Sequence, residues 1–381
     1  MKKIFCLALT LALGICCLGG CGKSGASETG LYYEASGIPS DKVLLTVDGW
    51  EVTAQEYFYW LTYNCDYISS YYQNERKIVD WSGDRNGQTL GEYAKAQARN
   101  TCALYAVIES WAQKYHLSVT EEDQKGIDAQ WDAAAEQAGG EEAYLASLAG
   151  MGVDKAFARQ ISADYYLYSH LYELYQTEGS ELHPDQADVE RYAQEKGFLT
   201  VEAILLSTAD AADDAARQKK RAEADEVLEK LNASSNPQEE FSALADTYSD
   251  GKDRDRYPNG FTFVPGSGTM PEAFDSAAQG LEENKWSGVV ETADGYYIIL
   301  RRPLDMDAVS ADYFDDMLQT AADNAKLQYS DEYGAIDTAD FYGKLTAARA
   351  KLDTAAGTSS AFGTLPAASA SAQSASGSGS D

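Results

Sequence analysis

The chain has 381 residues and a formal net charge of −31, from 61 acidic and 30 basic residues, with only three histidines. A surface this acidic repels a phosphate backbone, which disfavours nucleic acid as a partner. With 44% hydrophobic residues, the chain has enough apolar material for one or more cores, and its length suggests two domains or one domain with a large appendage.

The chain begins with a predicted signal peptide, residues 1–21. Two lysines are followed by an apolar run over residues 4–18 and then by Gly19-Gly20-Cys21. The basic start, the short apolar run and the small residues before a cleavage site are typical of secretion signals. The Leu-Gly-Gly-Cys ending resembles the lipobox of bacterial lipoproteins, which implies a lipid on Cys21. The alternatives are an ordinary signal peptide cut nearby and an uncleaved anchor.

Residues 22–40 are predicted to form a flexible leash behind that lipid, which would hold the protein on the outer face of the bacterial cytoplasmic membrane. Of the six cysteines, only Cys65 and Cys102 lie beyond this N-terminal region. They are neither a disulfide framework nor a metal site. The sequence leaves open whether they form one bridge or are two buried apolar residues.

Residues 41–198 are predicted to be a mostly helical domain that opens with one strand. Val43–Val47 predicts that strand, and Asp48-Gly49 a turn after it. Thr53 and Glu56 have the spacing of a capping box, which predicts a helix of about twenty residues. Further helices are expected at residues 90–115, from Thr120 onward, and at residues 153–175.

Aromatic residues are dense in this half of the chain. The apolar face of the first helix is predicted to comprise Tyr57, Trp60, Leu61, Ile68 and Tyr71. Tyrosines outside the predicted apolar faces are Tyr63, Tyr67, Tyr72, Tyr166 and Tyr172. Two interpretations stay open: they belong to the core and its rim, or they form an exposed cradle for unfolded polypeptide, because tyrosine supplies contact area at low entropy cost.

After a break at residues 178–185, the pattern changes. Residues 199–303 contain a strand, helices, a second strand, a helix and a hairpin, which predicts an α+β domain with a small antiparallel sheet covered by helices. These elements are expected at residues 200–207, 211–231, 237–248, 260–264, after Pro271, and at 287–292 and 296–301. Residues 304–355 are predicted to be helical, and residues 356–381 to be a disordered Ala/Ser/Gly tail.

The region from Thr200 to Arg302 resembles the parvulin family of peptidyl-prolyl cis-trans isomerases. The matching segments are Val201–Leu206, Phe241–Asp250, Gly268–Phe274, Trp286–Thr292 and Gly295–Leu300. The strand, turn and capped helix near the start of the chain resemble the N-terminal chaperone domain of PrsA-like and SurA-like extracytoplasmic foldases. This resemblance implies that residues 304–355 pack back on the chaperone domain, and that the partners are unfolded or nascent secreted polypeptides.

The resemblance also implies a proline-binding site. Isomerisation of an X-Pro bond is slow because its barrier is about 18–20 kcal/mol. Catalysis makes no bond to carbon, so an apolar site and polar groups beside the twisted amide suffice. Met270 and Phe274 match the family's proline-binding positions, and Phe261 and Phe263 are expected to line the same cavity. The alternative is that these side chains only fill the domain core.

The polar half of the site departs from the family. Parvulins usually carry a histidine in the first strand and another in the last strand, whereas the matching positions here are Ala203 and Tyr297. The candidate catalytic residues are Asp250, which is adjacent to the family's loop position near Gly251, Thr292, which matches a polar position of the family, and Tyr297. The hydroxyl of Tyr297 can donate a hydrogen bond, and the alternative is that its ring blocks the pocket. We expect isomerase activity to be weak or lost and peptide binding to persist.

No cofactor or metal site is predicted. Residues 250–260 contain the acids of a calcium loop, but Tyr257 stands where an oxygen ligand is needed, which favours a solvated loop. Two functions remain: a membrane-anchored extracytoplasmic foldase, and a non-catalytic holdase with a degenerate isomerase domain. A solute-binding protein is disfavoured because repeated strand-helix units are missing. The sequence leaves the oligomeric state open.

Overall fold

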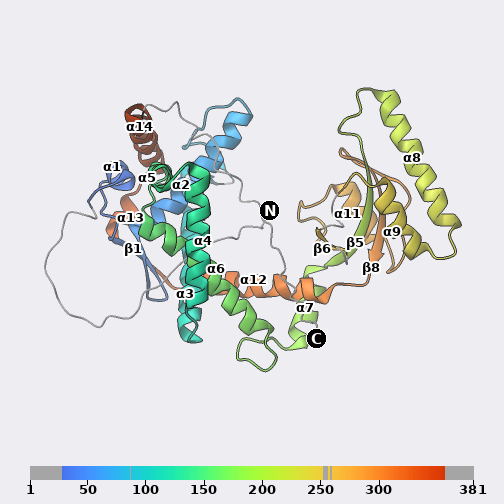
Figure 1. Ribbon diagram of the computed structural model, residues 1–381, viewed down its shortest axis with the longest axis horizontal. Coiled ribbons are helices and arrows are strands. Elements are labelled where there is room, and N and C mark those ends of the chain that lie inside the picture. Colours follow the sequence, from blue (N-terminus) through green and yellow to red (C-terminus); the bar gives the residue numbers. More distant parts are fainter. Residues whose placement is uncertain (1–27, 86, 252–255, 258–259, 357–381) are drawn as a thin grey trace. The chain divides into compact units, whose positions relative to one another are not determined.

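The structure is a computed structural model that describes residues 28–85, 87–251, 256–257 and 260–356. The predicted signal peptide, Cys21 and the predicted tail after residue 356 lie outside these residues. By their contacts, the described residues divide into two compact units. The sheet unit consists of Pro184–Asp316, and the helical unit consists of residues 28–183 and 317–356. Figure 1 shows the elements of both units, coloured along the chain.

A three-stranded antiparallel sheet joins the two segments of the helical unit. β1 (Val43–Val47) pairs with β2 (Trp50–Thr53) and with β9 (Leu327–Tyr329), so the strand order is β2-β1-β9. The predicted strand Val43–Val47 is confirmed. The prediction of helices alone over residues 304–355 missed β9, which has only three residues and pairs with a strand from the start of the chain.

The predicted leash is wrong from Leu31 onward. Residues Leu31–Ser36 form α1, which buries Leu31, Tyr32 and Ala35. The Tyr32 hydroxyl donates a hydrogen bond to the carbonyl of Met151 at 2.6 Å. α1 also packs against α14 (Thr338–Ala356). Apolar residues directly after Gly30 thus begin the folded chain earlier than composition suggested.

The capping box predicted at Thr53 and Glu56 is confirmed. The Thr53 hydroxyl accepts from the Glu56 backbone N–H at 3.4 Å, and the Glu56 carboxylate accepts from the Thr53 N–H at 2.6 Å. α2 (Ala54–Asn74) begins there. The other helices of this unit are α3 (Leu90–Lys114), α4 (Glu121–Ala138), α5 (Glu141–Gly150), α6 (Lys155–Gln176) and α13 (Asp331–Ala335). A short hairpin of β3 (Asp84–Arg85) and β4 (Gln88–Thr89) precedes α3.

Burial along α2 follows the predicted apolar face for most of its length. Tyr57 and Leu61 are fully buried and Ile68 is nearly so, but Tyr71 is 58% exposed. The prediction that Tyr71 belongs to the apolar face is wrong because burial in this helix ends at Ser69, before the last turn.

The two cysteines outside the N-terminal region are separate, buried thiols. Burial raises the pKa of both Cys65 and Cys102. The structure therefore favours the second alternative that the sequence left open, in which they act as small apolar residues.

The sheet unit is built on a four-stranded antiparallel sheet with the order β6-β5-β8-β7. β5 (Leu199–Ser207) pairs with β8 (Gly295–Arg302) in one continuous register from Thr200 opposite Arg302 to Ser207 opposite Gly295. The short strands β6 (Phe261–Phe263) and β7 (Val290–Glu291) flank this pair. With the helices described next, the sheet confirms the predicted α+β class.

Helices cover both faces of this sheet (Figure 1). α8 (Asp214–Ala233) and α9 (Pro237–Tyr248) lie on one face, and α11 (Glu272–Gln279) lies on the other. α7 (Gln186–Lys196) packs against the first part of α12 (Met306–Asn324), a helix that begins in the sheet unit and ends in the helical unit.

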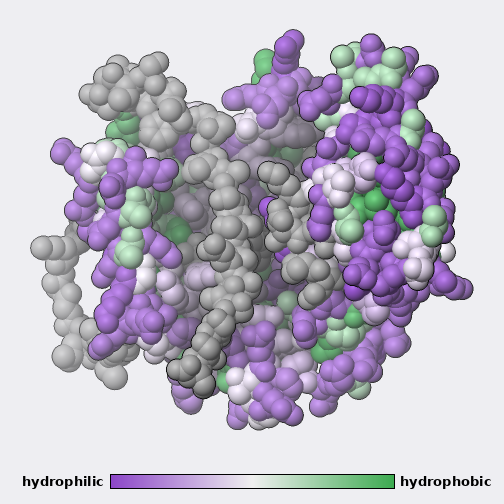
Figure 2. Space-filling model, turned by 45° about the vertical axis from the view of Figure 1, so that its right-hand side comes forward, coloured by the Kyte–Doolittle hydropathy of each residue, from purple (hydrophilic) through white to green (hydrophobic). Residues whose placement is uncertain are grey.

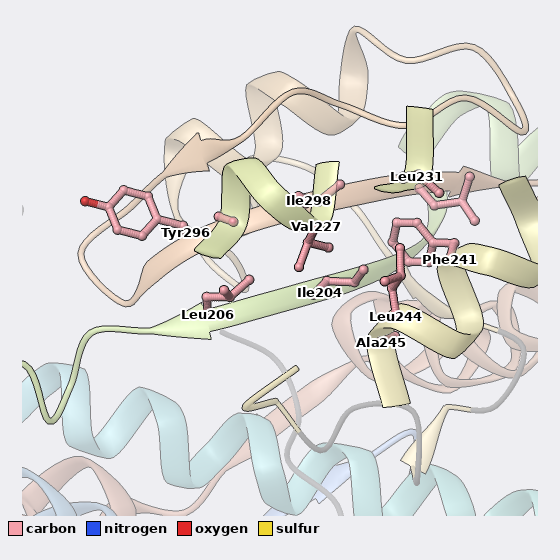
Figure 3. Packing of buried hydrophobic residues seen from close by; sticks show 11 residues of the cluster. Ile204, Leu206, Val227, Leu231, Phe241, Leu244, Ala245, Tyr296 and Ile298 are labelled. Atoms are coloured by element: carbon pink, nitrogen blue, oxygen red, sulfur yellow. The ribbon is translucent and has the colours of Figure 1, made fainter. Parts of the chain in front are cut away.

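The surface is mainly hydrophilic on the face drawn in Figure 2, as the net charge of −31 leads one to expect. Apolar side chains gather inside instead, and Figure 3 shows the cluster between the sheet and α8 and α9. There Ile204 and Ile298 from the sheet contact Val227 and Phe241 from the helices, all four fully buried. In the described part of the chain, no helix combines the length and apolarity needed to cross a membrane.

Candidate functional site

Strand alternation decides which side chains share a face of the sheet, because successive residues of a strand point to opposite sides. In β8, Tyr297 and Ile299 face α11, whereas Tyr296 and Ile298 face α8 and α9. In β5, Ala203 belongs to the same face as Tyr297. We call this side, with the residues of α11 that cover it, the aromatic face.

The two positions at which parvulins carry histidines meet on the aromatic face. Leu205 is opposite Tyr297 and Ala203 is opposite Ile299, so Ala203 and Tyr297 are diagonal neighbours. Diagonal residues of an antiparallel pair are about 7–8 Å apart, which long side chains can bridge. Here one position carries only a methyl group, and the other carries a phenol.

Tyr297 and three phenylalanines form a continuous row of rings. Tyr297 is 6% exposed, and its ring meets that of Phe274 edge-on with centroids 5.1 Å apart. The centroids of Phe274 and Phe263 are 6.0 Å apart, and Phe261 stacks on Phe263 at 5.3 Å. Phe263 and Phe274 are buried, so in this structure they help to form the core of the unit.

The aromatic face has a half-buried edge that solvent reaches. Phe261, Met270 and Val290 pack against the buried cluster while remaining partly exposed. The ring of Tyr257 lies 5.2 Å from that of Phe261 and extends this edge. Of the four predicted proline-binding residues, Phe261 and Met270 therefore offer accessible apolar surface, while Phe263 and Phe274 lie beneath it.

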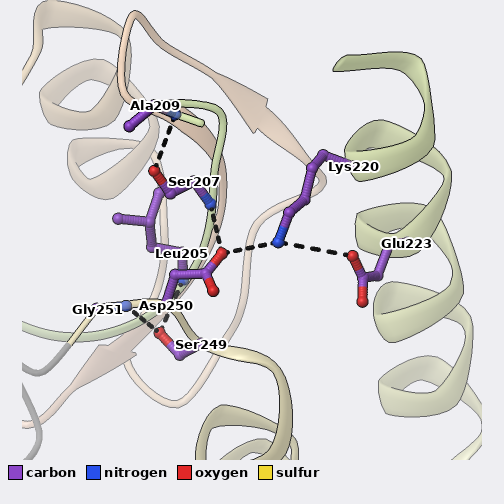
Figure 4. A network of polar contacts seen from close by, with 8 residues as sticks. All are labelled: Leu205, Ser207, Ala209, Lys220, Glu223, Ser249, Asp250 and Gly251. Carbon is purple, nitrogen blue, oxygen red and sulfur yellow. Dashed lines mark hydrogen bonds and ion pairs between the residues drawn. The ribbon is translucent and has the colours of Figure 1, made fainter. Parts of the chain in front are cut away.

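Asp250 is held in a polar network at the start of the loop after α9 (Figure 4). Its carboxylate accepts from the Ser207 backbone N–H at 2.9 Å and forms an ion pair with Lys220 at 2.9 Å. Its own N–H donates to the Leu205 carbonyl at 2.7 Å. Burial acts to raise its pKa, but Lys220 and the Ser207 N–H outweigh that effect, and the pKa lies below its usual value. Asp250 is thus an ionised, already neutralised anchor for the loop.

Lys220 is a partner that the sequence analysis did not connect with Asp250. It lies on α8, 30 residues before Asp250, and its Nζ is also 3.8 Å from the Glu223 carboxylate. Its position in an Ala/Lys/Glu-rich helix gave no signal of this contact, because many lysines of such helices are solvated.

Thr292 shapes the turn between β7 and β8. Its hydroxyl donates to the Gly295 carbonyl at 3.2 Å and accepts from the Asp294 N–H at 3.1 Å. Gly295 has a φ of +143°, and a Cβ placed there would lie 2.2 Å from the Leu206 carbonyl oxygen. The turn therefore needs glycine, and the Thr292 hydroxyl is occupied by backbone groups.

The described residues contain no group of three or more His, Cys, Asp or Glu side chains arranged to hold a metal ion. The residues of the aromatic face offer apolar contact and, through the hydroxyl of Tyr297, hydrogen bonding. Those are the interactions by which a protein binds a proline ring and stabilises a twisted amide.

A small antiparallel sheet with two helices on one face, and a third helix over an aromatic cluster on the other, has the architecture expected of a parvulin-type domain. The family described as rotamase, PPIC-type PPIASE domain, matches residues 204–302. The chain therefore contains a PPIC-type PPIase, or parvulin, domain, which confirms the resemblance recognised in the sequence.

The solved structures that match this chain include foldases and chaperones. The foldase protein PrsA from Streptococcus pneumoniae is 18% identical, with 74% of this chain and 95% of that chain covered and a TM-score of 0.31. PrsA from Bacillus subtilis is 18% identical, the match covers 72% of this chain and 91% of that chain, and the TM-score is 0.28. The SurA-like chaperones PEB4 and Cj1289 of Campylobacter jejuni are represented at 17% identity, 69% and 94% coverage and a TM-score of 0.22. TM-scores this low do not establish a common overall arrangement. A search of curated proteins finds no match.

Proposed function

We propose that the protein is an extracytoplasmic foldase whose parvulin-type domain binds X-Pro segments of unfolded secreted polypeptides. The match over residues 204–302 carries this proposal. The accessible apolar edge at Phe261 and Met270 supports it, because a proline ring needs a partly open apolar surface. The proposed tether is a lipid on Cys21 at the outer face of the cytoplasmic membrane, and it rests on the N-terminal sequence alone. The proposed chaperone domain is the helical unit, so its sequence-predicted bounds of 41–198 and 304–355 overlap the sheet unit at residues 184–198 and 304–316.

We further propose that isomerase activity is weaker than in relatives that carry both histidines. A hundredfold acceleration requires about 2.7 kcal/mol of preferential transition-state stabilisation. The methyl group of Ala203 offers no hydrogen bond, and the ring of Tyr297 is packed on Phe274. Asp250 and Thr292 already bind Lys220 and backbone groups. Among the described residues predicted for the site, few polar groups are left to supply that energy.

The test is two-dimensional exchange NMR on an Ala-Pro peptide. We expect slow exchange with the wild-type protein and faster exchange with the double variant Ala203→His, Tyr297→His, because the two imidazoles would be diagonal neighbours. Tyr297→Phe is the matched control, since it keeps the ring and removes only the hydroxyl. Strong acceleration by the wild-type protein would contradict weak activity, and loss of that acceleration in Tyr297→Phe would assign it to the phenol.

A second candidate function, a non-catalytic holdase, is favoured by a row of exposed tyrosines on α2. Tyr63, Tyr67 and Tyr71 are 40%, 67% and 58% exposed. Their spacing of four residues puts them on one side of the helix. We call them the tyrosine row. In contrast, the remaining tyrosines outside the apolar faces are half-buried, in keeping with the core-and-rim interpretation: Tyr72, Tyr166 and Tyr172.

The tyrosine row is tested with a client aggregation assay. Replacing all three tyrosines by serine should abolish suppression of aggregation if the row holds unfolded polypeptide, because it removes aromatic contact area at exposed positions. The Ala203→His, Tyr297→His variant serves as the opposite control, since it alters only the sheet unit. Unchanged suppression by the serine variant would exclude the row as the holding surface.

A further inference from the structure

A pocket within the helical unit combines several acids with aromatic walls. It lies between β2, α2, α3 and α6 and has a volume of about 30 Å³. A water molecule needs roughly 10–15 Å³ of such space, so the pocket admits one small polar head group. Its chemistry is set by Trp50, Glu56, Trp60, Tyr105, Glu109 and Asp164, which are among the lining residues.

The acids come from three different helices. Glu56 lies on α2, Glu109 on α3 and Asp164 on α6, and the described residues that line the pocket include no lysine, arginine or histidine. Glu56 is partly satisfied, because its carboxylate accepts from the Thr53 N–H at 2.6 Å and from the side chain of Gln160 at 3.2 Å. The pocket therefore concentrates carboxyl groups without a cationic partner in its wall.

Asp164 is the residue that points to a ligand. It is 2% exposed, and its Oδ1 has no hydrogen-bond partner. A buried carboxyl oxygen without a partner is costly, so such groups in folded proteins are usually bonded to protein, water or a ligand. Asp164 is also one of the residues that line the pocket, so a donor bound beside it is a partner that its carboxyl group could take.

The protonation of the cluster agrees with a site for a cation. Burial raises the pKa of Glu109 to about 8, and the charge of Glu56 acts in the same direction. Burial, with smaller contributions from Glu109 and Glu56, also raises the pKa of Asp164 well above its usual value. Burial therefore disfavours the charged form of both acids, and a positive charge bound beside them would favour it.

The walls suit a cation as well. The rings of Trp60 and Tyr105 are 5.1 Å apart, and both residues are half-buried, as is Trp50 on β2. Aromatic faces attract a cation within about 6 Å, most strongly those of tryptophan. Glu51 is exposed and also lines the pocket, so a negative charge lies where the pocket meets solvent.

We propose that this pocket binds the side-chain ammonium of a lysine in the polypeptide held by the helical unit. The inference rests on the proposed function, in which unfolded polypeptides are the partners. Lysine is favoured over arginine because its ammonium is a compact charge with three donors, whereas the guanidinium is a larger planar fork. The long apolar stem of lysine would lie against the tryptophan rings while the head reaches the acids.

The test measures peptide binding to the mature protein by calorimetry. Four unfolded peptides differ at one central residue, which is lysine, norleucine, acetyl-lysine or arginine. We expect the lysine peptide to bind at least tenfold tighter than the norleucine and acetyl-lysine peptides, with release of protons in buffers of different ionisation enthalpy. Equal affinity for the lysine and norleucine peptides would overturn the inference, and tighter binding of the arginine peptide would overturn the choice of lysine.

The double variant Asp164→Asn, Glu109→Gln should bind the lysine peptide only as tightly as the norleucine peptide. Glu173→Gln is the matched control, because it removes one charge from an exposed position of the same helix α6. Unchanged selectivity in the double variant would overturn the inference. Thermal melts establish that both variants are folded, and Glu109→Gln alone is used if the double variant is not.

A small probe separates failure of this inference from failure of the proposed function. We expect n-butylammonium to quench tryptophan fluorescence in the wild-type protein and not in Asp164→Asn, Glu109→Gln, whether or not any peptide binds. Absence of peptide binding would contradict the proposed function, and absence of quenching would contradict the pocket. Quenching by Mg²⁺ or Ca²⁺ at lower concentration than by n-butylammonium would assign the pocket to a metal ion instead.

Discussion

Replacing Glu109 by glutamine should stabilise the helical unit at neutral and alkaline pH. Glu109 lines the acidic pocket together with Glu56 and Asp164. Burial, with a smaller contribution from the charge of Glu56, raises its pKa from 4.5 to about 8, although a hydrogen bond with Trp50 acts in the other direction. Glutamine keeps the shape of the side chain and cannot ionise.

The sign follows from proton binding in the two states. Between pH 4.5 and about 8, the unfolded chain has released the Glu109 proton while the folded chain keeps it. The contribution of Glu109 to the free energy of unfolding is complete below pH 4.5 and is lost as the pH rises to about 8. The whole shift corresponds to roughly 4–5 kcal/mol. Because water reaches the pocket, the effect is smaller than the whole shift. For the wild-type protein we expect the free energy of unfolding to decrease by an amount on the order of 2 kcal/mol over this rise in pH.

The assay is urea unfolding between pH 5 and pH 8.5, followed by tryptophan fluorescence. This signal reports mainly on the helical unit, because five of the six tryptophans belong to it: Trp50, Trp60, Trp81, Trp111 and Trp131. The control Glu173→Gln replaces a carboxyl group by an amide at an exposed position. It accounts for the repulsion within a chain of net charge −31, which also changes with pH.

We expect the free energy of unfolding to fall less steeply with pH in Glu109→Gln than in the wild-type and Glu173→Gln proteins. Parallel curves for the two variants would refute the reasoning, because they would mean that Glu109 ionises in the folded state as easily as an exposed acid. Trp50 also lines the pocket, so the fluorescence of Glu109→Gln at pH 5 should be compared with that of the wild-type protein before unfolding.

Three further variants address the sheet unit, whose unfolding is followed by the ¹⁹F NMR resonance of Trp286 in protein labelled with fluorotryptophan. Phe274→Ala should lower its free energy of unfolding by about 3–5 kcal/mol, because the ring is fully buried among aromatic neighbours; a loss below 1 kcal/mol would mean that the ring is not core. Gly295→Ala should destabilise by more than about 1 kcal/mol, since its Cβ would meet the Leu206 carbonyl; Gly288→Ala, with nothing near its Cβ, is the control and should be close to neutral in a thermal melt. Asp250→Asn should lower stability by less than about 1 kcal/mol, because both partners of its ion pair are partly exposed; a larger loss in urea unfolding would mean that the network in Figure 4 is a main support of the loop.

Local sequence signals predicted the elements that depend on neighbouring residues. The capping box at Thr53 and Glu56 identified the start of α2, and α9 has the predicted bounds Pro237 and Tyr248. These signals act within one turn of helix, so they need no knowledge of the rest of the fold. In contrast, β9 is three residues long and exists because it pairs with β1, which lies about 280 residues earlier in the chain.

The resemblance to parvulins identified the aromatic face, but it did not predict how its polar residues are used. The register of β5 and β8 puts Ala203 and Tyr297, the two family histidine positions, on one side of the sheet. The contact of Asp250 with Lys220 and the turn formed by Thr292 depend on loop geometry that composition and spacing do not encode. The sequence therefore located the region of the site and left the roles of these side chains to the structure.

The acidic pocket had a sequence signal that was not used. Asp164 lies seven residues after Phe157 and three after Ile161, which is the spacing of the apolar face of α6. An acid on the apolar face of a helix is either buried with the face or lies near a helix end where solvent reaches it. In the structure Asp164 is 2% exposed and is therefore buried. A charged residue in an apolar stripe is therefore a better indicator of a site than the overall excess of acids.

Asp164 and Asp250 carry the same functional group and are driven in opposite directions by their surroundings. Asp250 has Lys220 and a backbone N–H beside it, so its charged form is stabilised and its pKa is lowered. Asp164 has buried surroundings and other acids beside it, so its charged form is disfavoured and its pKa is raised. A carboxylate that is already paired has little left to offer a ligand, whereas a buried carboxyl group beside other acids has its charged form favoured by a nearby cation. By this criterion Asp164 in the helical unit is better placed than Asp250 to meet a cation, whereas the aromatic face of the sheet unit offers apolar contact.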